Sequence, residues 1–195
     1  MKMKNIGRKF YHLSGLVLIL VYSRMDREHG LIMLASLLVV ATALDIARLM
    51  IKPVNSFVYS HLTSFIRESE RTTLTGSPWY ILGILCSAAL FDLPVAIMAV
   101  AFLACGDVSA TTVGERWGRT KLWDGKKSLE GTAAFIGAGF VAGVVISRFY
   151  PLSLAVIIPG AVSAAIIEIL PLKVNDNLTK PLLSGAVMQL IVRMS

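Results

Sequence analysis

Residues 93–132, LPVAIMAVAFLACGDVSATTVGERWGRTKLWDGKKSLEGT, join an apolar run to an extended polar loop. The run 93–105 contains no charged residue, whereas the loop from Gly106 to Thr132 is rich in glycine and in charged residues. An uncharged apolar run of this kind is typical of a helix that is surrounded by lipid or by other helices. The stretch therefore predicts a membrane helix that leads into a polar loop.

The composition of the whole chain indicates that a bilayer is its solvent. The 195 residues are 55% hydrophobic and 16% charged, with a mean hydropathy of +0.71, which is more apolar surface than one soluble core of this length needs. The net charge of +7 comes from short basic clusters between apolar runs, so no nucleic-acid binding is expected. Cys86 and Cys105 lie in apolar runs without a CxxC or Cys/His pattern, and we interpret both as packing residues.

Seven apolar runs are candidates for membrane helices. They cover about residues 10–22, 31–51, 79–91, 93–105, 132–147, 152–172 and 178–192. Several are shorter than the roughly 20 residues that a full crossing requires, so some are expected to enter the bilayer only as short or half-helices. No cleavage site follows the first run, which is therefore kept as a membrane helix. The predicted fold class is all-α, a single integral membrane domain over 1–195 with about seven transmembrane helices.

The distribution of basic residues predicts the orientation of this domain. With the N-terminus inside, fifteen of the nineteen Lys and Arg residues fall on the inner side, as the positive-inside rule requires. The segment 52–78 is too polar to span and is expected to lie along the interface as a helix that ends before the turn 75–78. We expect a multi-pass protein of a bacterial or archaeal plasma membrane, with its N-terminus and the loop 106–132 cytoplasmic. The sequence leaves its oligomeric state open, a homo-oligomer included.

The loop 106–132 carries a pattern that a simple connector does not need. Five residues recur at helical spacing and form one face with a carboxylate at one end and a cation at the other: Asp107, Ala110, Gly114, Gly118 and Lys121. In a straight helix Asp107 and Lys121 would be about 21 Å apart, too far to serve one triphosphate. A bend is therefore expected within 118–125, which would return the basic residues that follow toward Asp107.

Asp107 is the most informative residue of the loop. A carboxylate directly after an apolar run is costly near a membrane unless it has a partner, so it indicates a functional site. Mg²⁺ held by Asp107 and by phosphates, with lysine and arginine neutralising the remaining charge, is the arrangement that phosphoryl transfer needs. Glu130 is a candidate for a further ligand or for fixing a lysine. For the basic residues alone, contacts of a positive-inside loop with anionic lipid are an alternative.

At this point the residues resemble those of a known family. The pattern Asp107-x-x-Ala110-x-x-x-Gly114-x-x-x-Gly118-x-x-Lys121, followed by 126–132 (KKSLEGT), is similar to the nucleotide motif of CTP-dependent lipid kinases, which include dolichol kinase, phytol kinase and the yeast-type diacylglycerol kinase. The opening Arg8-Lys9-x-x-His12-x-x-Gly15 and the late Asp176-Asn177-Leu178-x-x-Pro181-Leu182 also fit, so the resemblance spans nearly the whole chain.

The resemblance implies CTP as the phosphate donor, a membrane lipid alcohol as the acceptor and Mg²⁺ as the metal. The acceptor would be a polyprenol-like or phytol-like alcohol or diacylglycerol. The candidate nucleotide-binding residues are the following members of the loop: Gly114, Arg116, Gly118, Arg119, Lys121, Lys126, Lys127, Ser128, Glu130 and Gly131.

Polar residues outside the loop extend the candidate site. Arg8 and His12 share a helical face at the start of the first run, where His12 is suited to deprotonate or orient the acceptor hydroxyl. As an alternative, Arg8 and Lys9 anchor the helix in the membrane. Asp45 and Arg48 are three residues apart and are expected to pair, either to neutralise each other or to take part in phosphate or metal binding.

Oxygen ligands also occur near the end of the chain. Glu168 lies in an apolar run, and Asp176 and Asn177 follow in the next turn, so that together they offer ligands from the other side of a Mg²⁺–nucleotide site. Asp176 and Asn177 are equally suited to cap the last helix, with Pro181 near its first turn. Capping does not account for Glu168.

Two other functions remain open at this stage. Phosphatidate cytidylyltransferases carry a similar motif, and a cytidylyltransferase would release pyrophosphate where a kinase releases CDP. A small ion transporter that uses the intramembrane carboxylates is the non-enzymatic alternative.

Overall fold

Most of the chain is helical. The structure, a computed structural model, describes residues 6–62, 64–66, 68–123, 125, 127–172 and 174–195. Its helical elements, of which η1 is a 3₁₀-helix and η2 a π-helix, are α1 (Ile6–Tyr22), α2 (Arg27–Met50), α3 (Lys52–His61), η1 (Glu68–Glu70), α4 (Gly76–Leu90), α5 (Leu93–Ala101), η2 (Phe102–Gly106), α6 (Asp107–Trp117), α7 (Leu129–Ile146), α8 (Leu154–Ile169) and α9 (Asp176–Met194). The strands β1 (Lys121–Leu122) and β2 (Lys127–Ser128) pair antiparallel.

Every one of the seven apolar runs lies mainly in a helix. Three helical segments are long and apolar enough to cross a membrane, namely α2, the segment Leu93–Trp117 and α7, and α4 and α8 are shorter apolar helices. The chain is thus a helical membrane protein, and the part of it that the structure describes also contains the short ladder of β1 and β2. Seven full crossings and the cytoplasmic side of the loop stay predictions.

The helix that contains the fourth apolar run continues beyond the end of that run. The helix continues through α5, the π-turn η2 and α6 as far as Trp117, so Asp107 lies within a helical segment instead of at the start of a loop. Asp107 and Ala110 are buried against neighbouring helices, and the backbone stays helical at both positions. A π-turn next to a polar site is frequent in proteins, because the extra residue redirects the side chains that follow.

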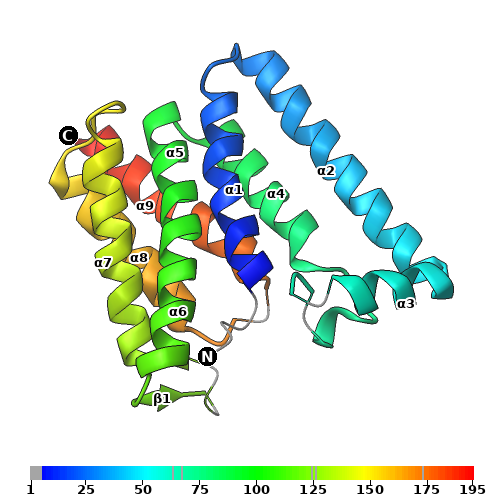
Figure 1. Cartoon of the computed structure of the whole chain (residues 1–195). Helices are drawn as coiled ribbons and strands as arrows, with labels where there is room; N and C mark the ends of the chain where they lie inside the picture. Colours follow the sequence, from blue (N-terminus) through cyan, green and yellow to red (C-terminus); the bar gives the residue numbers. More distant parts are fainter. Residues whose placement is uncertain (1–5, 63, 67, 124, 126, 173) are drawn as a thin grey trace.

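The segment α5–η2–α6 forms the centre of the molecule. Residues 95–104 are fully buried. One apolar cluster joins this column to α7, α8 and α9, and a second joins it to α1, α2 and α4. Figure 1 shows α1, α4, α7, α8 and α9 around the column, while α2 diverges from the others. Because the middle of this column is apolar and fully buried, charged groups are expected at the ends of the helices that surround it.

The segment 52–78 is less regular than the single helix expected there. It contains the ten-residue α3 and the short η1, and α4 already begins at Gly76. Residues 76–78 form the first turn of α4 because Thr75 caps the helix, its hydroxyl accepting a hydrogen bond from the backbone N–H of Ser77, and because proline is tolerated in a first turn.

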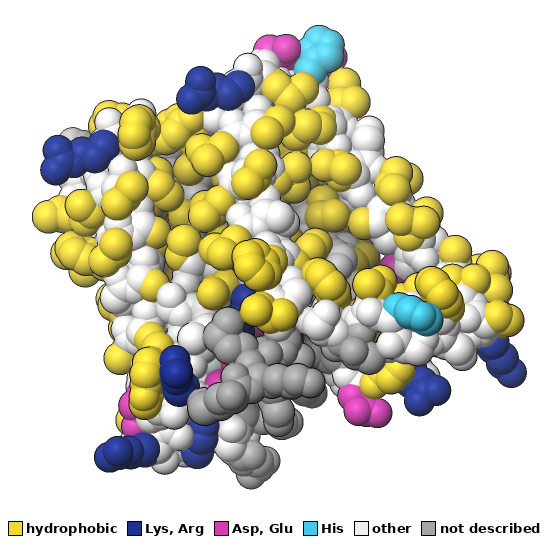
Figure 2. Space-filling view, in the orientation of Figure 1, with side chains coloured by type: hydrophobic (Ala, Val, Ile, Leu, Met, Phe, Trp, Pro, Cys, Tyr) yellow, Lys and Arg dark blue, Asp and Glu magenta, His cyan; other side chains and the backbone are white. Residues whose placement is uncertain are grey.

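The surface agrees with a membrane environment. In Figure 2 apolar side chains cover the middle of the visible face, and Lys and Arg side chains gather toward its two ends. Charged side chains at both ends of an apolar belt are typical of helical membrane proteins.

Candidate functional site

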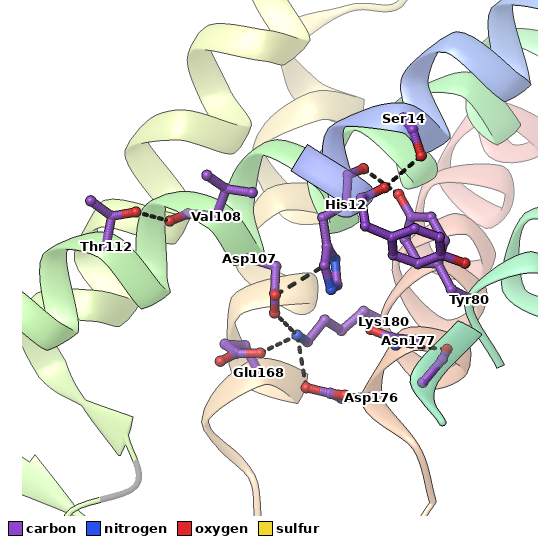
Figure 3. Close-up of polar contacts among 12 residues, drawn as sticks. His12, Ser14, Tyr80, Asp107, Val108, Thr112, Glu168, Asp176, Asn177 and Lys180 are labelled. Atoms are coloured by element: carbon purple, nitrogen blue, oxygen red, sulfur yellow. Dashed lines mark hydrogen bonds and ion pairs between the residues drawn. The ribbon is translucent and has the colours of Figure 1, made fainter. Parts of the chain in front are cut away.

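A buried ammonium group lies among three carboxylates. Lys180 is 0% exposed, and its Nζ is 2.5 Å from Asp107 Oδ1 and 3.0 Å from Asp176 Oδ2. It also forms an ion pair with Glu168 Oε2. Figure 3 shows these side chains converging on the Lys180 ammonium. We call Asp107, Glu168, Asp176 and Lys180 the charge cluster.

Three separate helices bring the charge cluster together. Asp107 is the first residue of α6, directly after the π-turn, and Glu168 lies in the last turn of α8. Asp176 and Lys180 are four residues apart at the start of α9, a spacing that places both side chains on one helical face. Because these helix ends are packed together, the cluster does not depend on a flexible loop for its geometry.

The β-ladder adds a second ammonium group to the cluster. The pairing of Leu122 with Lys127 turns the chain back after α6, and Lys127 forms an ion pair with Glu168 and lies 3.9 Å from Asp176 Oδ2. Ser128 then caps α7, its hydroxyl accepting from the backbone N–H of Gly131. The bend expected after Gly118 therefore returns Lys127 to the acidic residues.

His12 approaches the same cluster from α1. It is 2% exposed, and its Nδ1 lies 3.6 Å from Asp107 Oδ2. The hydroxyl of Tyr80 donates a hydrogen bond to the backbone carbonyl of His12, which ties α1 to α4 at this level. The two oxygens of Asp107 thus face different neighbours, Oδ1 facing Lys180 and Oδ2 facing His12.

A cleft of about 940 Å³ opens beside the charge cluster. This volume lies within the range of roughly 300–1,000 Å³ that is usual for small-molecule sites. Polar or small residues from α1, α6, the ladder, α7 and the α8–α9 connection line it, among them Arg8, Asp107, Thr111, Gly114, Glu115, Lys121, Lys127, Ser128, Gly131, Glu168, Asn175 and Asp176. The lining thus combines basic and acidic groups, which suits a ligand that carries both phosphates and a cation.

Asp176 is ionised in this setting. It precedes the apolar stretch 178–192, and burial alone would raise the pKa of its carboxyl. The ammonium groups of Lys180 and Lys127 outweigh burial and lower the pKa of Asp176 to about 2, because an opposite charge at close range favours the charged form. A carboxylate with this pKa is available as a ligand throughout the physiological pH range.

The donor set fits a magnesium ion. One oxygen from each of Asp107, Glu168 and Asp176 lies within 4.8 Å of the others, and carboxylate oxygens are the protein ligands that Mg²⁺ prefers. The Lys180 ammonium interacts with all three carboxylates. A bound ion would therefore share these carboxylates with Lys180 or take its place.

Several of the predicted nucleotide residues line the cleft. These are Gly114, Lys121, Lys127, Ser128 and Gly131. Lys121 lies at its edge, where its Nζ donates to the carbonyl of Gly114 at 3.0 Å. Lys126 lies outside the described residues.

Other predicted nucleotide residues have different positions in the structure. Arg116 and Arg119 are exposed and do not belong to the described lining of the cleft, and Arg116 lies over the Trp117 ring. Glu130 is also absent from this lining, and no ion pair joins it to a lysine among the described residues. Both of its oxygens accept from the backbone N–H of Thr120. Gly118 ends α6, and a Cβ there would lie 2.4 Å from the carbonyl oxygen of Gly114, so packing explains this glycine.

The expected pair of Asp45 and Arg48 forms, but away from the cleft. Arg48 Nε donates to Asp45 Oδ1 at 2.8 Å, and the guanidinium also donates to the carbonyls of Glu70 and Thr73. Asp45 Oδ2 accepts from the backbone N–H of Thr75 at 2.6 Å. The pair joins the segment before α4 to α2, and neither residue belongs to the described lining of the cleft.

Two further supporting residues also have structural partners. Asn177 donates to the carbonyl of Gly76 at 3.1 Å, and the cap of α9 is Asn175, not Asp176 or Asn177. Lys9 forms an ion pair with Glu115 at 3.1 Å, which joins α1 to α6.

Lys180 is the site residue that sequence reasoning missed. A signal existed, since a lysine stands within the apolar run 178–192, four residues after Asp176. A charge at such a position needs a partner, but the positive-inside count treats it as one more basic residue near a helix end.

Comparisons with known proteins give relatives of one kind. CTP-dependent diacylglycerol kinase 1 of Saccharomyces cerevisiae is 27% identical over 213 residues, which cover 96% of this chain and 73% of that protein. The enzyme of the same name from Schizosaccharomyces pombe is 30% identical over 159 residues, 72% of this chain and 71% of that protein. Dolichol kinase of S. cerevisiae is 30% identical over 149 residues, 74% of this chain but only 28% of that protein. No family model and no solved structure matches the chain.

Proposed function

We propose that this chain, which belongs to the family of CTP-dependent lipid kinases, transfers the terminal phosphoryl group of CTP to the hydroxyl of a membrane lipid. The names of two relatives give diacylglycerol and dolichol as their acceptors. For this chain the acceptor class is a polyprenol-like or phytol-like alcohol or diacylglycerol, which shares with those lipids a hydroxyl group on an apolar body.

The observation that carries this proposal is the cleft beside the charge cluster. It combines the ammonium groups of Lys121 and Lys127 with the carboxylates of Asp107, Glu168 and Asp176. Phosphoryl transfer depends mainly on positioning and on charge stabilisation of the phosphates, for which fixed cations and a metal site are the usual means. Gly114 and Gly131 have no side chains and lie against each other, which lets α6 and α7 approach closely beside the cleft.

The reaction is an exchange of one phosphorus–oxygen bond for another. The lipid hydroxyl oxygen forms a bond to the γ-phosphorus of CTP, and the bond from that phosphorus to the β–γ bridging oxygen breaks, so that CDP leaves with the electron pair. The hydroxyl proton passes to His12 Nδ1, which lies beside Asp107, and then to water. Lys121 and Lys127 contact the phosphates during this step.

Asp107, Glu168 and Asp176 are the residues that would hold Mg²⁺. When bound, the ion would neutralise part of the negative charge on the phosphates of CTP. Lys180 keeps the three carboxylates close to one another, since each forms an ion pair with it.

The test is to identify the nucleotide product. Purified protein in lipid-containing micelles is incubated with CTP, Mg²⁺ and a panel of lipid alcohols, namely prenols, phytol and diacylglycerol. Parallel reactions contain the corresponding lipid monophosphates, which are the substrates that a cytidylyltransferase needs. We expect CDP and a lipid monophosphate in equal amounts. Pyrophosphate together with a CDP-lipid would instead show a cytidylyltransferase, and no turnover with any lipid would remove the kinase proposal.

A substitution at Asp107 links the activity to the cleft. Asp107→Asn keeps the shape of the side chain but removes its charge, and we expect kcat to fall by about a hundredfold or more, the order seen when one electrostatic contact to a transition state is lost. Glu28→Gln, an exposed acid in the first turn of α2, is the control and should keep full activity. An active Asp107→Asn variant would contradict the assigned role.

A further inference from the structure

A second, much smaller cavity lies between α1 and α6. It has a volume of about 20 Å³, and its lining consists of Arg8, Lys9, His12, Asp107, Val108 and Thr111. Such a space holds about one water-sized group, because one water needs roughly 10–15 Å³ measured in this way. It has no room for a nucleotide or for a lipid chain.

A buried polar atom faces this cavity without a partner. Nδ1 of His12 has no hydrogen-bond partner among the described residues, although His12 is 2% exposed. The nearest acceptor, Asp107 Oδ2, is 3.6 Å away, which is too far for a hydrogen bond. A buried polar group is rarely left unpaired, and a single oxygen atom placed between the two side chains would satisfy His12 Nδ1.

Asp107 belongs to both cavities. Asp107, Arg8 and Thr111 line the large cleft as well as the small cavity. The carboxylate of Asp107 presents Oδ1 to Lys180 and Oδ2 to His12, and Figure 3 shows it between these two side chains. A phosphate in the cleft and an oxygen atom in the small cavity would therefore both lie beside Asp107.

Two residues of α1 that line the small cavity are each followed in the sequence by an exposed apolar residue. Phe10 and Leu13, which flank Lys9 and His12 in the sequence, are 67% and 37% exposed. In a membrane protein such side chains face lipid. An apolar chain lying against this face of α1 would have its polar end at the level of His12.

From these contacts we propose that the small cavity is the subsite for the acceptor hydroxyl, with the apolar body of the lipid outside it along α1. This inference rests on the proposed kinase function and adds the place where the acceptor binds. The hydroxyl occupies the space beside His12 Nδ1 and Asp107 Oδ2, while the triphosphate lies in the large cleft. Only the hydroxyl itself is enclosed, since the cavity holds about one water-sized group.

Val108 provides the sharpest test because it lines the small cavity and not the described wall of the cleft. In Val108→Phe the larger side chain fills the cavity. We expect the KM for the lipid alcohol to rise by about tenfold or more, the usual effect of a misfit of a few carbon atoms in a pocket, whereas the KM for CTP stays unchanged. Initial rates are measured as CDP formed while each substrate is varied.

Val113→Phe is the matched control, since Val113 lies on the same helix but lines neither cavity, and its KM for the alcohol should equal that of the original chain. An unchanged KM for the alcohol in Val108→Phe, or an equal rise for CTP, would overturn the subsite. If Val108→Phe does not fold, as judged by its unfolding midpoint, Val108→Ala decides the question.

Val108→Ala enlarges the cavity beside the hydroxyl. A secondary alcohol carries an extra carbon next to its hydroxyl and should fit the enlarged cavity better. We expect the kcat/KM for the secondary alcohol, divided by that for the primary alcohol of the same chain length, to rise by about tenfold. An unchanged ratio overturns the subsite while the kinase function stands. Absence of CDP formation by the original chain would instead remove the kinase function itself.

Discussion

At the scale of single residues, Lys180 supplies the positive charge that lets three neighbouring carboxylates lie close together. In Lys180→Met the ammonium group disappears while Asp107, Glu168 and Asp176 remain together. We expect a loss of about 3–5 kcal/mol in the free energy of unfolding, the order found when one partner of a buried ion pair is removed. The measurement is thermal or denaturant unfolding in detergent with a chelator present.

Magnesium provides the second part of this test. Because a divalent cation neutralises the same carboxylates, added MgCl₂ should restore part of the lost stability of Lys180→Met. Lys52→Met, an exposed lysine at the start of α3, should change stability by no more than about 0.5 kcal/mol. A Lys180→Met variant as stable as the original chain in chelator would show that the cluster does not hold the helix ends together.

At the scale of elements, the contact between α6 and α7 sets the width of the cleft. A Cβ at Gly131 would lie 2.8 Å from the backbone oxygen of Ala110, so Gly131→Ala must push the start of α7 away from α6. We expect a loss of about 1–3 kcal/mol in stability, as for other overpacked contacts, and a higher KM for CTP. Unfolding in detergent and initial rates at varied CTP check both effects.

The matched control lies on the same helix. A Cβ at Gly137 has no neighbour within 4 Å, and Gly137→Ala should be neutral or stabilise α7 by up to about 1 kcal/mol through helix propensity. Equal effects of the two substitutions would mean that close packing against α6 does not matter for the cleft.

At the scale of the whole molecule, the ends of the helices predict the orientation in the membrane. Figure 1 shows the N-terminal end of α1 at the same end of the molecule as β1, while the α1–α2 and α7–α8 connections lie at the opposite end. We expect Arg148→Cys to react with an impermeant maleimide on intact cells, and Arg119→Cys to react only after permeabilisation. Both positions are exposed.

The background for this labelling is the chain with Cys86→Ala and Cys105→Ala, which removes its two cysteines. That background should stay unlabelled in both conditions. The reverse pattern, with Arg119→Cys labelled on intact cells, would place the cleft away from cytoplasmic CTP and would contradict the proposed function.

The sequence by itself determined where the apolar helices lie and which acids need a partner. Apolar runs form helices because backbone groups in lipid must bond within their own segment. Asp107 and Glu168 stood out because a carboxylate in an apolar run is costly without a partner. The family pattern around 107–132 likewise depends only on residue types and spacing.

Only the tertiary structure decided which groups the charged side chains contact. It placed Lys180 among the three carboxylates, directed Asp45 and Arg48 to the backbone near Thr75, and carried the central helix beyond Asp107 to Trp117. These outcomes join residues that are up to 73 positions apart. The physical reason is that periodicity reports only which face of a helix is apolar, whereas ion pairs between helix ends depend on how whole helices pack.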